Sequence, residues 1–304
     1  MEIVRTKADL RARLAEHRAQ GLSVALVPTM GALHEGHASL VQRAKSEDMD
    51  IIVVSVFVNP TQFNNPDDLR TYPRNEEADA KLLESLGVHY MFAPAVEEMY
   101  PEPDTRQFSF PPLDTVMEGA NRPGHFNGVC QVVSKLFTIV EADRAYFGDK
   151  DYQQLCIVRA LAKSMGIDTV VVGCPIIREE DGLAKSSRNQ LLTPAHRAEA
   201  SIIHRTLQTA GREFLRRGYD DTRRWVVEQI EASGLFKVEY FTQADASTLQ
   251  ELVNLERNPE GGITYTCKTG EGIETIQKPY MKGCIIGFIA VQAGQVRLID
   301  NQRF

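Results

Sequence analysis

The segment that decides the fold is residues 22–37, LSVALVPTMGALHEGH. It opens with a mostly apolar run, residues 22–27, which has the length and composition of a buried strand. Pro28 and Gly31 then break the run, and a helix is predicted from about Gly36. A strand, a glycine-containing loop and a helix N-terminus in this order favour bound anions, because free N–H groups and the helix dipole meet there. The segment therefore predicts a phosphate-binding loop.

Two histidines lie in this loop. His34 and His37 are three positions apart, which places both on one face if the helix has begun there. The pair alone leaves open a packing role or a metal site, although no third ligand follows at a recognisable spacing. The sequence His-Glu-Gly-His after a strand resembles the HIGH signature of nucleotidylyltransferases and class I aminoacyl-tRNA synthetases. That resemblance implies that Gly36 leaves room for an adenine and that the histidines bind a triphosphate.

The composition is that of a soluble globular protein, with 43% hydrophobic and 25% charged residues in a chain of 304, enough for two domains. The net charge of -7 argues against nucleic acid as a partner, because nucleic-acid binders usually carry a basic surface. Five cysteines without a CxxC spacing predict reduced thiols in a cytosolic protein. The N-terminus shows no apolar signal core, and no run approaches the roughly 20 apolar residues of a membrane span, so we expect a cytoplasmic protein without membrane contact.

Strand and helix patterns alternate through the first part of the chain. The run DIIVVSVFV, residues 50–58, is rich in β-branched residues, as are parallel strands covered on both faces. Helices are predicted at residues 7–20, 76–86, 129–140, 152–165, 195–217 and 221–233, and strands at residues 22–27, 50–58, 88–93, 145–147, 168–172, 237–242, 284–291 and 296–299.

We therefore expect an α/β fold with two domains. Residues 1–177 are predicted to form a Rossmann-like, doubly wound parallel sheet, and residues 178–304 a smaller C-terminal α+β domain. Residues 95–125 are rich in proline, glycine and charge and are predicted as an irregular excursion. A loop of that length in a compact domain is usually a functional cover or a mobile segment.

Four polar loops follow predicted strands. They carry, in chain order, His34 and His37; Asn59 and Gln62; Lys150, Asp151 and Gln154; and Ser186, Ser187 and Arg188. Each loop alone also fits a structural role, such as a turn cap for Gln62, a solvated charge cluster around Lys150 or a helix N-cap for the serines. In a doubly wound sheet, however, the loops at the carboxyl ends of strands converge on one ligand crevice. Four such loops in one chain therefore predict an active site.

The order and content of these loops resemble the pantothenate synthetase (pantoate–β-alanine ligase) family. The matching segments are PTMGALHEGH (28–37), SVFVNPTQF (55–63), YPR (72–74), GHFNGV (124–129), YFGDKDYQQL (146–155), REEDGLAKSSRN (178–189) and RLIDN (297–301). They spread over nearly the whole chain, which makes the resemblance far more specific than a single HIGH-type motif.

The resemblance implies an ATP-dependent, AMP-forming ligase that makes a C–N amide bond in pantothenate and coenzyme A biosynthesis. The carboxylate of (R)-pantoate attacks the α-phosphorus of ATP, which gives a pantoyl adenylate and pyrophosphate. The amine of β-alanine then attacks the acyl carbon, which releases pantothenate and AMP. The resemblance also implies Mg²⁺ on the ATP phosphates and a homodimer. Because negative charge develops on phosphate oxygens in the first step, cationic or N–H donors are needed there.

The resemblance assigns the site residue by residue. As catalytic residues it implies His34, His37, Lys150 and Arg188, with His37 as the proton donor. As ATP contacts it implies Met30, Gly31, Ala32, Leu33, His34, Glu35, Gly36, His37, Gly148, Asp149, Lys150, Asp151, Ile177, Lys185, Ser186, Ser187 and Arg188. For pantoate and β-alanine it implies Gln62, Gln154 and Asn59. Asp79 is a candidate for a water-mediated contact to Mg²⁺, an ion that usually keeps several waters.

Two features depart from the family pattern. Lys185 stands where Met or Leu is common before Ser-Ser-Arg, and it either contacts a phosphate or points to solvent. Residues 258–283 are longer than the usual link, and strand-like runs on both sides of Gly270 and Gly272 predict a β-hairpin. We expect it to decorate the surface, and a lid or a dimer contact stays open as the alternative.

Other functions stay open at this point. One alternative is another HIGH-motif nucleotidylyltransferase that keeps the nucleotide on its product. A class I synthetase is disfavoured, because the chain is acidic and has no room for a large anticodon-reading domain. A nucleotide-binding regulator is disfavoured as well, because it would not need both Gln62 and Gln154 in addition to the ATP residues.

Overall fold

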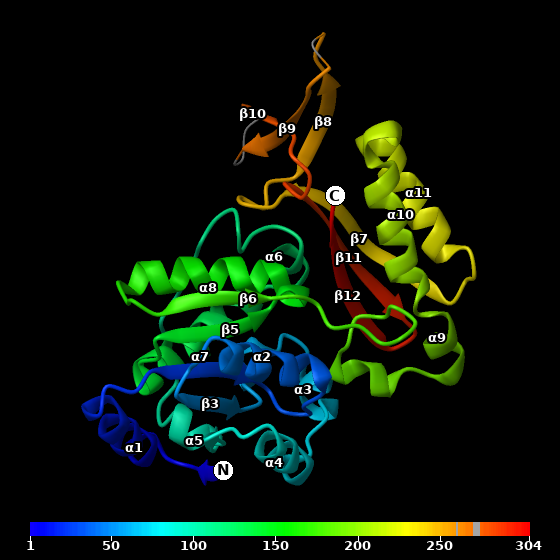
Figure 1. Ribbon diagram of the computed structural model, residues 1–304. Helices are drawn as coiled ribbons and strands as arrows, with labels where there is room; N and C mark the ends of the chain where they lie inside the picture. The colour runs from blue at the N-terminus through cyan, green and yellow to red at the C-terminus, as the bar shows by residue number, and fades with distance from the viewer. Residues whose placement is uncertain (260, 270–273) are drawn as a thin grey trace. The chain divides into compact units, whose positions relative to one another are not determined.

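The computed structural model describes residues 1–259, 261–269 and 274–304 and divides into two compact units (Figure 1). The first unit comprises Met1–Phe110, Arg122–Ile177 and Lys185–Ser187, and the second comprises Pro111–Asn121, Arg178–Ala184 and Arg188–Phe304. Two short segments therefore differ from the predicted division after Ile177: Pro111–Asn121 belongs to the second unit, and Lys185–Ser187 belongs to the first. The first of them, Pro111–Asn121, groups with the second unit because Glu118 forms an ion pair with Arg297 at 2.7 Å.

The first unit is built on a six-stranded parallel sheet. In sheet order its strands are β1 (Glu2–Val4), β4 (Tyr90–Phe92), β3 (Ile51–Val56), β2 (Val24–Thr29), β5 (Arg144–Gly148) and β6 (Val170–Cys174). The chain builds β2, β3 and β4 outward in one direction and then returns to place β5 on the other side of β2. The expected doubly wound fold is thus confirmed, and its topological switch point lies between β2 and β5, where such folds bind ligands.

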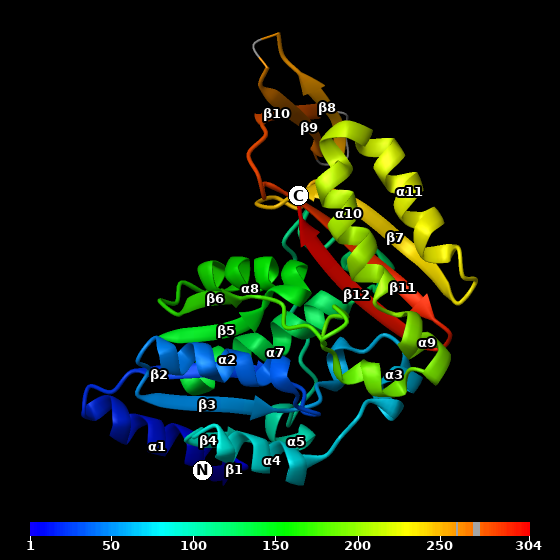
Figure 2. The same ribbon diagram turned by 45° about the vertical axis from the view of Figure 1, so that its right-hand side comes forward.

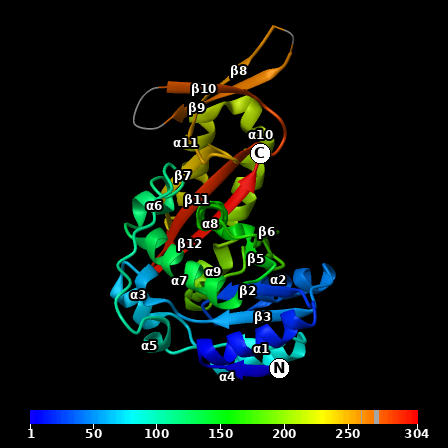
Figure 3. The same ribbon diagram turned by 90° about the vertical axis from the view of Figure 1, so that its left-hand side faces the viewer.

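Helices cover both faces of this sheet. They are α1 (Lys7–Ala19), α2 (Glu35–Ser46), α3 (Pro66–Thr71), α4 (Glu76–Ser85), α5 (Val96–Met99), α7 (His125–Val140) and α8 (Tyr152–Met165), with the short 3-10 helices η1 (Pro60–Gln62) and η2 (Asp149–Asp151). Leu40 and Val41 of α2 and Leu83 of α4 pack on one face, and α7 lies on the other face of β2 (Figure 3). Leu26 and Val27 point to opposite faces of β2 and are both fully buried, as expected for a strand that is covered on both sides.

The structure corrects the sequence-based prediction at three elements. The strand β1 was not predicted, because its three residues are too few to show a pattern and pair with β4 far along the chain. The helix α7 begins at His125, not at Val129, so the GHFNGV motif forms its first turn. The predicted helix at residues 195–217 is divided into two helices, Pro194–Glu199 and Ile202–Arg217. The excursion at residues 95–125 has the short ordered pieces that were predicted, α5 and α6 (Glu118–Asn121).

The second unit contains two antiparallel sheets and a helical pair (Figure 2). Its elements are α9 (Pro194–Glu199), α10 (Ile202–Arg217), α11 (Tyr219–Glu231), β7 (Phe236–Asp245), β8 (Leu252–Arg257), β9 (Ile263–Thr269), β10 (Glu274–Pro279), β11 (Ile285–Ala293) and β12 (Val296–Arg303), and the 3-10 helix η3 (Ser187–Leu191) precedes them. One sheet has the order β12-β11-β7, with α10 and α11 packed against it, and the other has the order β10-β9-β8. This arrangement confirms the smaller C-terminal domain as α+β. Within the described residues, no helix combines the length and the apolar character that a membrane span requires.

The additional segment forms the predicted hairpin but does not decorate the surface. β9 and β10 pair antiparallel, with Tyr265 opposite Lys278, whereas Gly270 and Gly272 of the predicted turn lie outside the described residues. Tyr265 is only 2% exposed and Cys267 is fully buried, and both belong to the hydrophobic core of the second unit. The prediction that the hairpin only decorates the surface is therefore wrong, because alternate side chains of β9 fill the core.

A buried carboxylate attaches this hairpin to the rest of the unit. Asp245, at the end of β7, accepts from the hydroxyl of Tyr265 at 2.5 Å and from Nζ of Lys278 at 2.9 Å. Its other oxygen accepts from the backbone N–H groups of Ser247 at 2.9 Å and Thr248 at 2.8 Å. Burial opposes ionisation, but these donors outweigh it and hold the pKa of Asp245 well below its ordinary value. The hairpin is thus connected to the second unit by both apolar packing and a charged contact.

Removing the hydroxyl of Tyr265 tests this connection. We expect Tyr265→Phe to lower the free energy of unfolding by about 1–3 kcal/mol, because buried Asp245 then loses a donor. The measurement is urea unfolding followed by circular dichroism. Tyr280→Phe is the matched control, because within the described residues its hydroxyl has no hydrogen-bond partner although its ring packs on the same core. Equal losses in the two variants would contradict the role given to Asp245.

Candidate active site

The histidine loop, residues 29–37, connects β2 to α2 at the switch point of the sheet. The chain leaves β2 at Thr29 and turns through Gly31 and Ala32, which adopt φ angles of 82° and 49°. The hydroxyl of Thr29 accepts from the N–H of Gly31 at 3.2 Å and donates to the carbonyl of Ser55 in β3 at 2.7 Å. The turn is therefore tied to the sheet before α2 begins at Glu35.

Asp79, from α4, holds the middle of the histidine loop. Its Oδ1 accepts from the N–H of Leu33 at 2.7 Å, and its Oδ2 accepts from the N–H of Ala32 at 3.0 Å. The residue is only 3% exposed. Burial raises the pKa of Asp79, while the two N–H donors act in the opposite direction. The geometry assigns this carboxylate to fixing the loop, and the water-mediated contact to Mg²⁺ stays a prediction.

The two histidines are held in one tautomer by the backbone. Nδ1 of His34 accepts from the N–H of Gly36 at 3.1 Å, and Nδ1 of His37 accepts from the N–H of His34 at 3.3 Å. A ring nitrogen that accepts carries no proton, so the proton of each neutral ring is on Nε2. The ring centroids lie 4.2 Å apart. The start of α2 therefore presents two adjacent Nε2–H donors.

Gly36 is required by the ring of His34. A Cβ atom at position 36 would lie 2.8 Å from Cε1 and 2.9 Å from Nδ1 of His34. Any larger residue would thus displace the histidine from its position over the helix N-terminus. The predicted reason for a glycine at position 36 is room for an adenine, and the close approach of the His34 ring is a second reason.

The charge state of His37 follows from its surroundings. Burial lowers the pKa of His37 to about 3, with further contributions from His34 and from the positive charge of Lys150. The imidazole is therefore neutral at physiological pH. It can donate a hydrogen bond to an anion without carrying a charge of its own.

Lys150 enters the site from the neighbouring strand. β5 ends at Gly148, and the chain passes through η2 into α8, whose first turn carries the half-buried Gln154. Nζ of Lys150 lies 3.1 Å from Oδ2 of Asp151. The third loop follows β5 and the histidine loop follows β2, so the two loops leave the sheet from neighbouring strands.

The segment Lys185–Ser187 packs on the histidine loop. The carbonyl of Ile177 accepts from the N–H of Lys185 at 2.9 Å, and Oγ of buried Ser187 donates to the carbonyl of Ala32 at 3.0 Å. Nζ of Lys185 forms an ion pair with Oε2 of Glu35 at 2.8 Å, and this hydrogen bond lowers the pKa of Glu35. Neither predicted position of Lys185, on a phosphate or in solvent, describes this contact. Ser186, between Lys185 and Ser187, is half-buried. Arg188 follows and begins the last segment of the second unit, Arg188–Phe304.

The second loop contributes a pair of buried amides. Nε2 of Gln62 lies 3.0 Å from Sδ of Met30 in the histidine loop, and its Oε1 accepts from Nδ2 of Asn59 at 3.1 Å. Asn59 is 1% exposed, and its Nδ2 also donates to the carbonyl of Gly128 at 3.0 Å. The structure thus corrects the prediction for Asn59. Its amide is used inside the protein and orients Gln62, so it is not offered to a substrate.

His125, the first residue of α7, contacts this loop, although the sequence motifs assign it no role. Its Nδ1 lies 2.8 Å from the carbonyl of Gln62, and its Nε2 lies 3.2 Å from Nη1 of Arg122. A carbonyl only accepts and a guanidinium only donates, so the ring carries its proton on Nδ1. His125 therefore holds the backbone of Gln62. The GHFNGV segment indicated in the sequence that His125 could have a role, but its hydrogen bond to the carbonyl of Gln62 is visible only in the structure.

The site has no donor cluster for a resident metal. Within residues 1–259, 261–269 and 274–304, no three His, Cys, Asp or Glu side chains come together in a way that could hold an ion. Both oxygens of Asp79 already accept backbone N–H groups. These residues fit an ion that arrives with a nucleotide and is bound chiefly by phosphates and water.

A family model and curated relatives match this chain over nearly its whole length. The family whose model matches residues 2–303 is described as Pantoate-beta-alanine ligase. A pantothenate synthetase of Bacteroides fragilis is 51% identical over 304 residues, which cover 100% of this chain and 99% of the relative. One of Porphyromonas gingivalis is 47% identical over 306 residues, with 100% and 99% covered.

Solved structures give the same result. The crystal structure of pantothenate synthetase from Thermus thermophilus is similar with a TM-score of 0.83 and 39% identity, covering 99% of both chains. That of pantoate–β-alanine ligase from Francisella tularensis, described as complexed with Beta-gamma ATP and β-alanine, has a TM-score of 0.77 and 32% identity. It covers 100% of this chain and 97% of that chain.

Asp79→Asn tests whether the carboxylate fixes the histidine loop. Asparagine accepts through one oxygen only, so its amide hydrogens would face one of the two loop N–H groups. An unpaired buried group costs about 1–3 kcal/mol, so we expect the Kd for ATP to rise about tenfold. The measurement is isothermal titration calorimetry. Glu84→Gln, at an exposed position of the same helix, is the control, and an unchanged Kd in Asp79→Asn would refute the assignment.

His37 is expected to stay uncharged in the free protein far below neutral pH. Its folded pKa of about 3 lies below the unfolded value of about 6.5. Between these values only the unfolded chain binds the proton, so the contribution of His37 to stability falls as the pH drops through this window. We expect the ring signal, assigned in NMR spectra by its loss in His37→Gln, to stay constant from about pH 8 to about pH 5. A titration midpoint near the unfolded value would show that the ring is solvated.

Proposed function

The chain belongs to the pantoate–β-alanine ligase family, and we propose that its active site joins (R)-pantoate to β-alanine in two steps through a pantoyl adenylate. The observation that carries the mechanism is the pair of fixed Nε2–H donors at the start of α2, with Lys150 beside them. This arrangement suits a triphosphate, because N–H donors, the helix N-terminus and a positive charge act on the same anion.

In the first step a pantoate carboxylate oxygen attacks the α-phosphorus of ATP. The new O–P bond forms as the bond to the β-phosphate oxygen breaks, so negative charge moves onto pyrophosphate. Donors that are already oriented toward this charge stabilise it without reorganisation. We assign this role to Nε2–H of His34 and His37 and to the ammonium group of Lys150, which acts as a point charge.

The charge state of His37 refines the role that the family resemblance implies. A ring with a pKa of about 3 in the free protein holds no extra proton to transfer at neutral pH. In this charge state His37 can act as a hydrogen-bond donor to a phosphate, and its role as a proton donor stays an implication of the family resemblance. Its neutral state has a further advantage, because it does not pair with the attacking carboxylate and lower its nucleophilicity.

In the second step the neutral amine of β-alanine attacks the acyl carbon. A C–N bond forms, the C–O bond to the phosphate breaks, AMP leaves, and the amine gives up a proton to solvent. Gln62 and Gln154 are the proposed pantoate contacts in both steps. Neutral amides recognise hydroxyl and carboxylate oxygens without neutralising the carboxylate that has to react.

Three further properties come from the family resemblance alone. Magnesium is proposed as the ion that ATP brings with it, and it would supply charge neutralisation on the phosphates. Ile177, Ser186 and Arg188 are proposed as ATP contacts, and Asp151 as an acceptor for the ribose hydroxyls. A homodimer in the cytoplasm completes the proposal, with no nucleic acid or membrane partner.

Exchange of labelled pyrophosphate into ATP tests the two-step mechanism. We expect exchange to require pantoate and to proceed without β-alanine, because the first step is reversible before the amine arrives. Addition of β-alanine should then yield AMP and pantothenate in equal amounts. Lys150→Ala should slow exchange by about 10²–10³, the usual loss when one oriented donor to a developing anion is removed.

Controls separate this mechanism from its alternatives. The circular dichroism of Lys150→Ala must match that of the unsubstituted protein, so that the loss reports on chemistry and not on folding. Exchange without pantoate, or ADP in place of AMP, would exclude the proposed reaction. A product that retains the nucleotide would favour another HIGH-motif nucleotidylyltransferase.

A further inference from the structure

The orientation of the Gln62 side chain is set by a chain of amide contacts that starts at a backbone carbonyl. The carbonyl of Gly128 can only accept, and it lies 3.0 Å from one end of the Asn59 amide. That end is therefore the NH2 group. The second hydrogen of the same NH2 group points to the amide oxygen of Gln62, at 3.1 Å. This in turn places the NH2 group of Gln62 toward Sδ of Met30, at 3.0 Å.

This orientation decides what Gln62 offers to a ligand. Its oxygen is occupied by Asn59, so its free hydrogen-bonding capacity is that of a donor. The thioether of Met30 is a weak acceptor, and a hydroxyl or carboxylate oxygen is a better one. The inverted amide would present an oxygen, which repels a carboxylate and can only accept from a hydroxyl. Donation to a pantoate oxygen therefore depends on keeping Gln62 in this one orientation.

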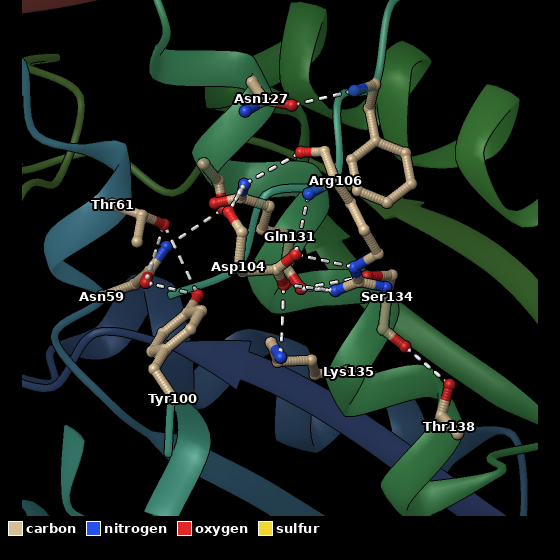
Figure 4. A network of polar contacts seen from close by, with 12 residues as sticks. Asn59, Thr61, Tyr100, Asp104, Arg106, Asn127, Gln131, Ser134, Lys135 and Thr138 are labelled. Carbon is tan, nitrogen blue, oxygen red and sulfur yellow. Dashed lines mark hydrogen bonds and ion pairs between the residues drawn. The ribbon is translucent and has the colours of Figure 1, made fainter. Parts of the chain in front are cut away.

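The other end of Asn59 is held by two hydroxyl groups. Its Oδ1 accepts from the hydroxyl of Tyr100 at 2.8 Å and from Oγ1 of Thr61 at 3.2 Å (Figure 4). Both donors face the oxygen, so rotation of the Asn59 amide would place its NH2 group against Tyr100 and lose the contact to Gly128. Tyr100 makes the shorter of the two contacts. Burial also raises the pKa of its hydroxyl, which keeps the proton that it donates.

Tyr100 is itself fixed by a charged network behind the site (Figure 4). The ammonium group of Lys135 lies 4.9 Å from the centre of the Tyr100 ring and 3.2 Å from Oδ2 of Asp104. Arg106 forms a second ion pair with Asp104 at 2.6 Å. Gln131 of α7 donates to the carbonyls of Asp104 and Arg106 at 2.9 Å and 3.0 Å. The start of the predicted irregular excursion is thus rigidly attached to α7.

The backbone under Gln62 is fixed from the same helix. A Cβ atom at Gly128 would lie 2.2 Å from the carbonyl oxygen of Thr61 and 2.6 Å from Cα of Gln62. The turn η1 therefore packs directly on the backbone of α7, and only glycine permits this approach. With the backbone held in this way, the remaining freedom of Gln62 is the rotation of its amide.

We propose that Tyr100 is a positioning residue for pantoate: its hydroxyl holds Asn59 in the orientation that turns the N–H donors of Gln62 toward the substrate. The inference rests on the proposed function, since it concerns the pantoate contact of that same site. Tyr100 acts through Asn59 and Gln62 and does not touch the reacting atoms.

Tyr100→Phe removes only the hydroxyl group and tests the proposal. We expect the KM for pantoate to rise about tenfold, the usual effect of losing one orienting hydrogen bond, while the KM for ATP stays unchanged. Tyr90→Phe is the matched control, because the Tyr90 hydroxyl bonds to His17 at 2.8 Å in the same unit but has no part in the amide contacts. An unchanged KM for pantoate, or an equal rise for ATP, would overturn the proposal.

A double variant separates positioning from general loosening. In Gln62→Ala the amide that Tyr100 orients is absent, so adding Tyr100→Phe should produce no further rise in the KM for pantoate. Additive effects would show that Tyr100 acts by another route. If Tyr100→Phe does not fold, Lys135→Met supplies the same comparison, with an expected rise of a few-fold for pantoate alone; no rise would again overturn the proposal. Failure of the unsubstituted protein to use pantoate would refute the proposed function, whereas normal use together with a silent Tyr100→Phe refutes only this inference.

Discussion

Asp79 accepts hydrogen bonds from two backbone N–H groups, and the rest of the site depends on this contact. A tight turn between a strand and a helix exposes N–H groups that a buried segment has to pair. Asp79 pairs those of Ala32 and Leu33 from 47 and 46 positions away in the sequence. Once the turn is fixed, the carbonyl of Ala32 faces Ser187 and α2 begins where the rings of His34 and His37 can accept from its first N–H groups.

The sequence predicts those parts of the fold whose cause is local. The strands β2 and β3 are apolar runs because both of their faces are covered, and this pattern is visible in the residues themselves. The strand β1 escapes detection because its position comes from pairing with β4 and not from its own three residues. The hairpin of β9 and β10 is predicted from its own residues, whereas its burial depends on partners that are distant in the sequence and is not predicted. Tyr265 looks like any strand residue until Asp245 is found opposite its hydroxyl.

The site shows the same limit in chemical terms. Residue types that act on phosphates, such as His37 and Lys150, are recognisable from their motifs. The sequence cannot show that the carboxylate of Asp79 accepts the N–H groups of a distant loop. Nor can it separate an amide that binds a substrate from one that orients a neighbour, as Asn59 does. Tautomers and charge states are also set by burial and by partners that are distant in the sequence, so they follow from the structure alone.

Both lysines of the site are paired with carboxylates in the free protein. Lys150 is paired with Asp151 at 3.1 Å, and Lys185 with Glu35 at 2.8 Å, while His37 is neutral. An incoming triphosphate therefore meets oriented N–H groups together with lysines whose charge is already partly balanced. Dipoles that are held in place stabilise an anion without a large attraction at long range. Such a site distinguishes ligands by the positions of their phosphate oxygens. It does not retain pyrophosphate by charge alone. The proposed reaction requires this, because pyrophosphate has to leave before the next ATP binds.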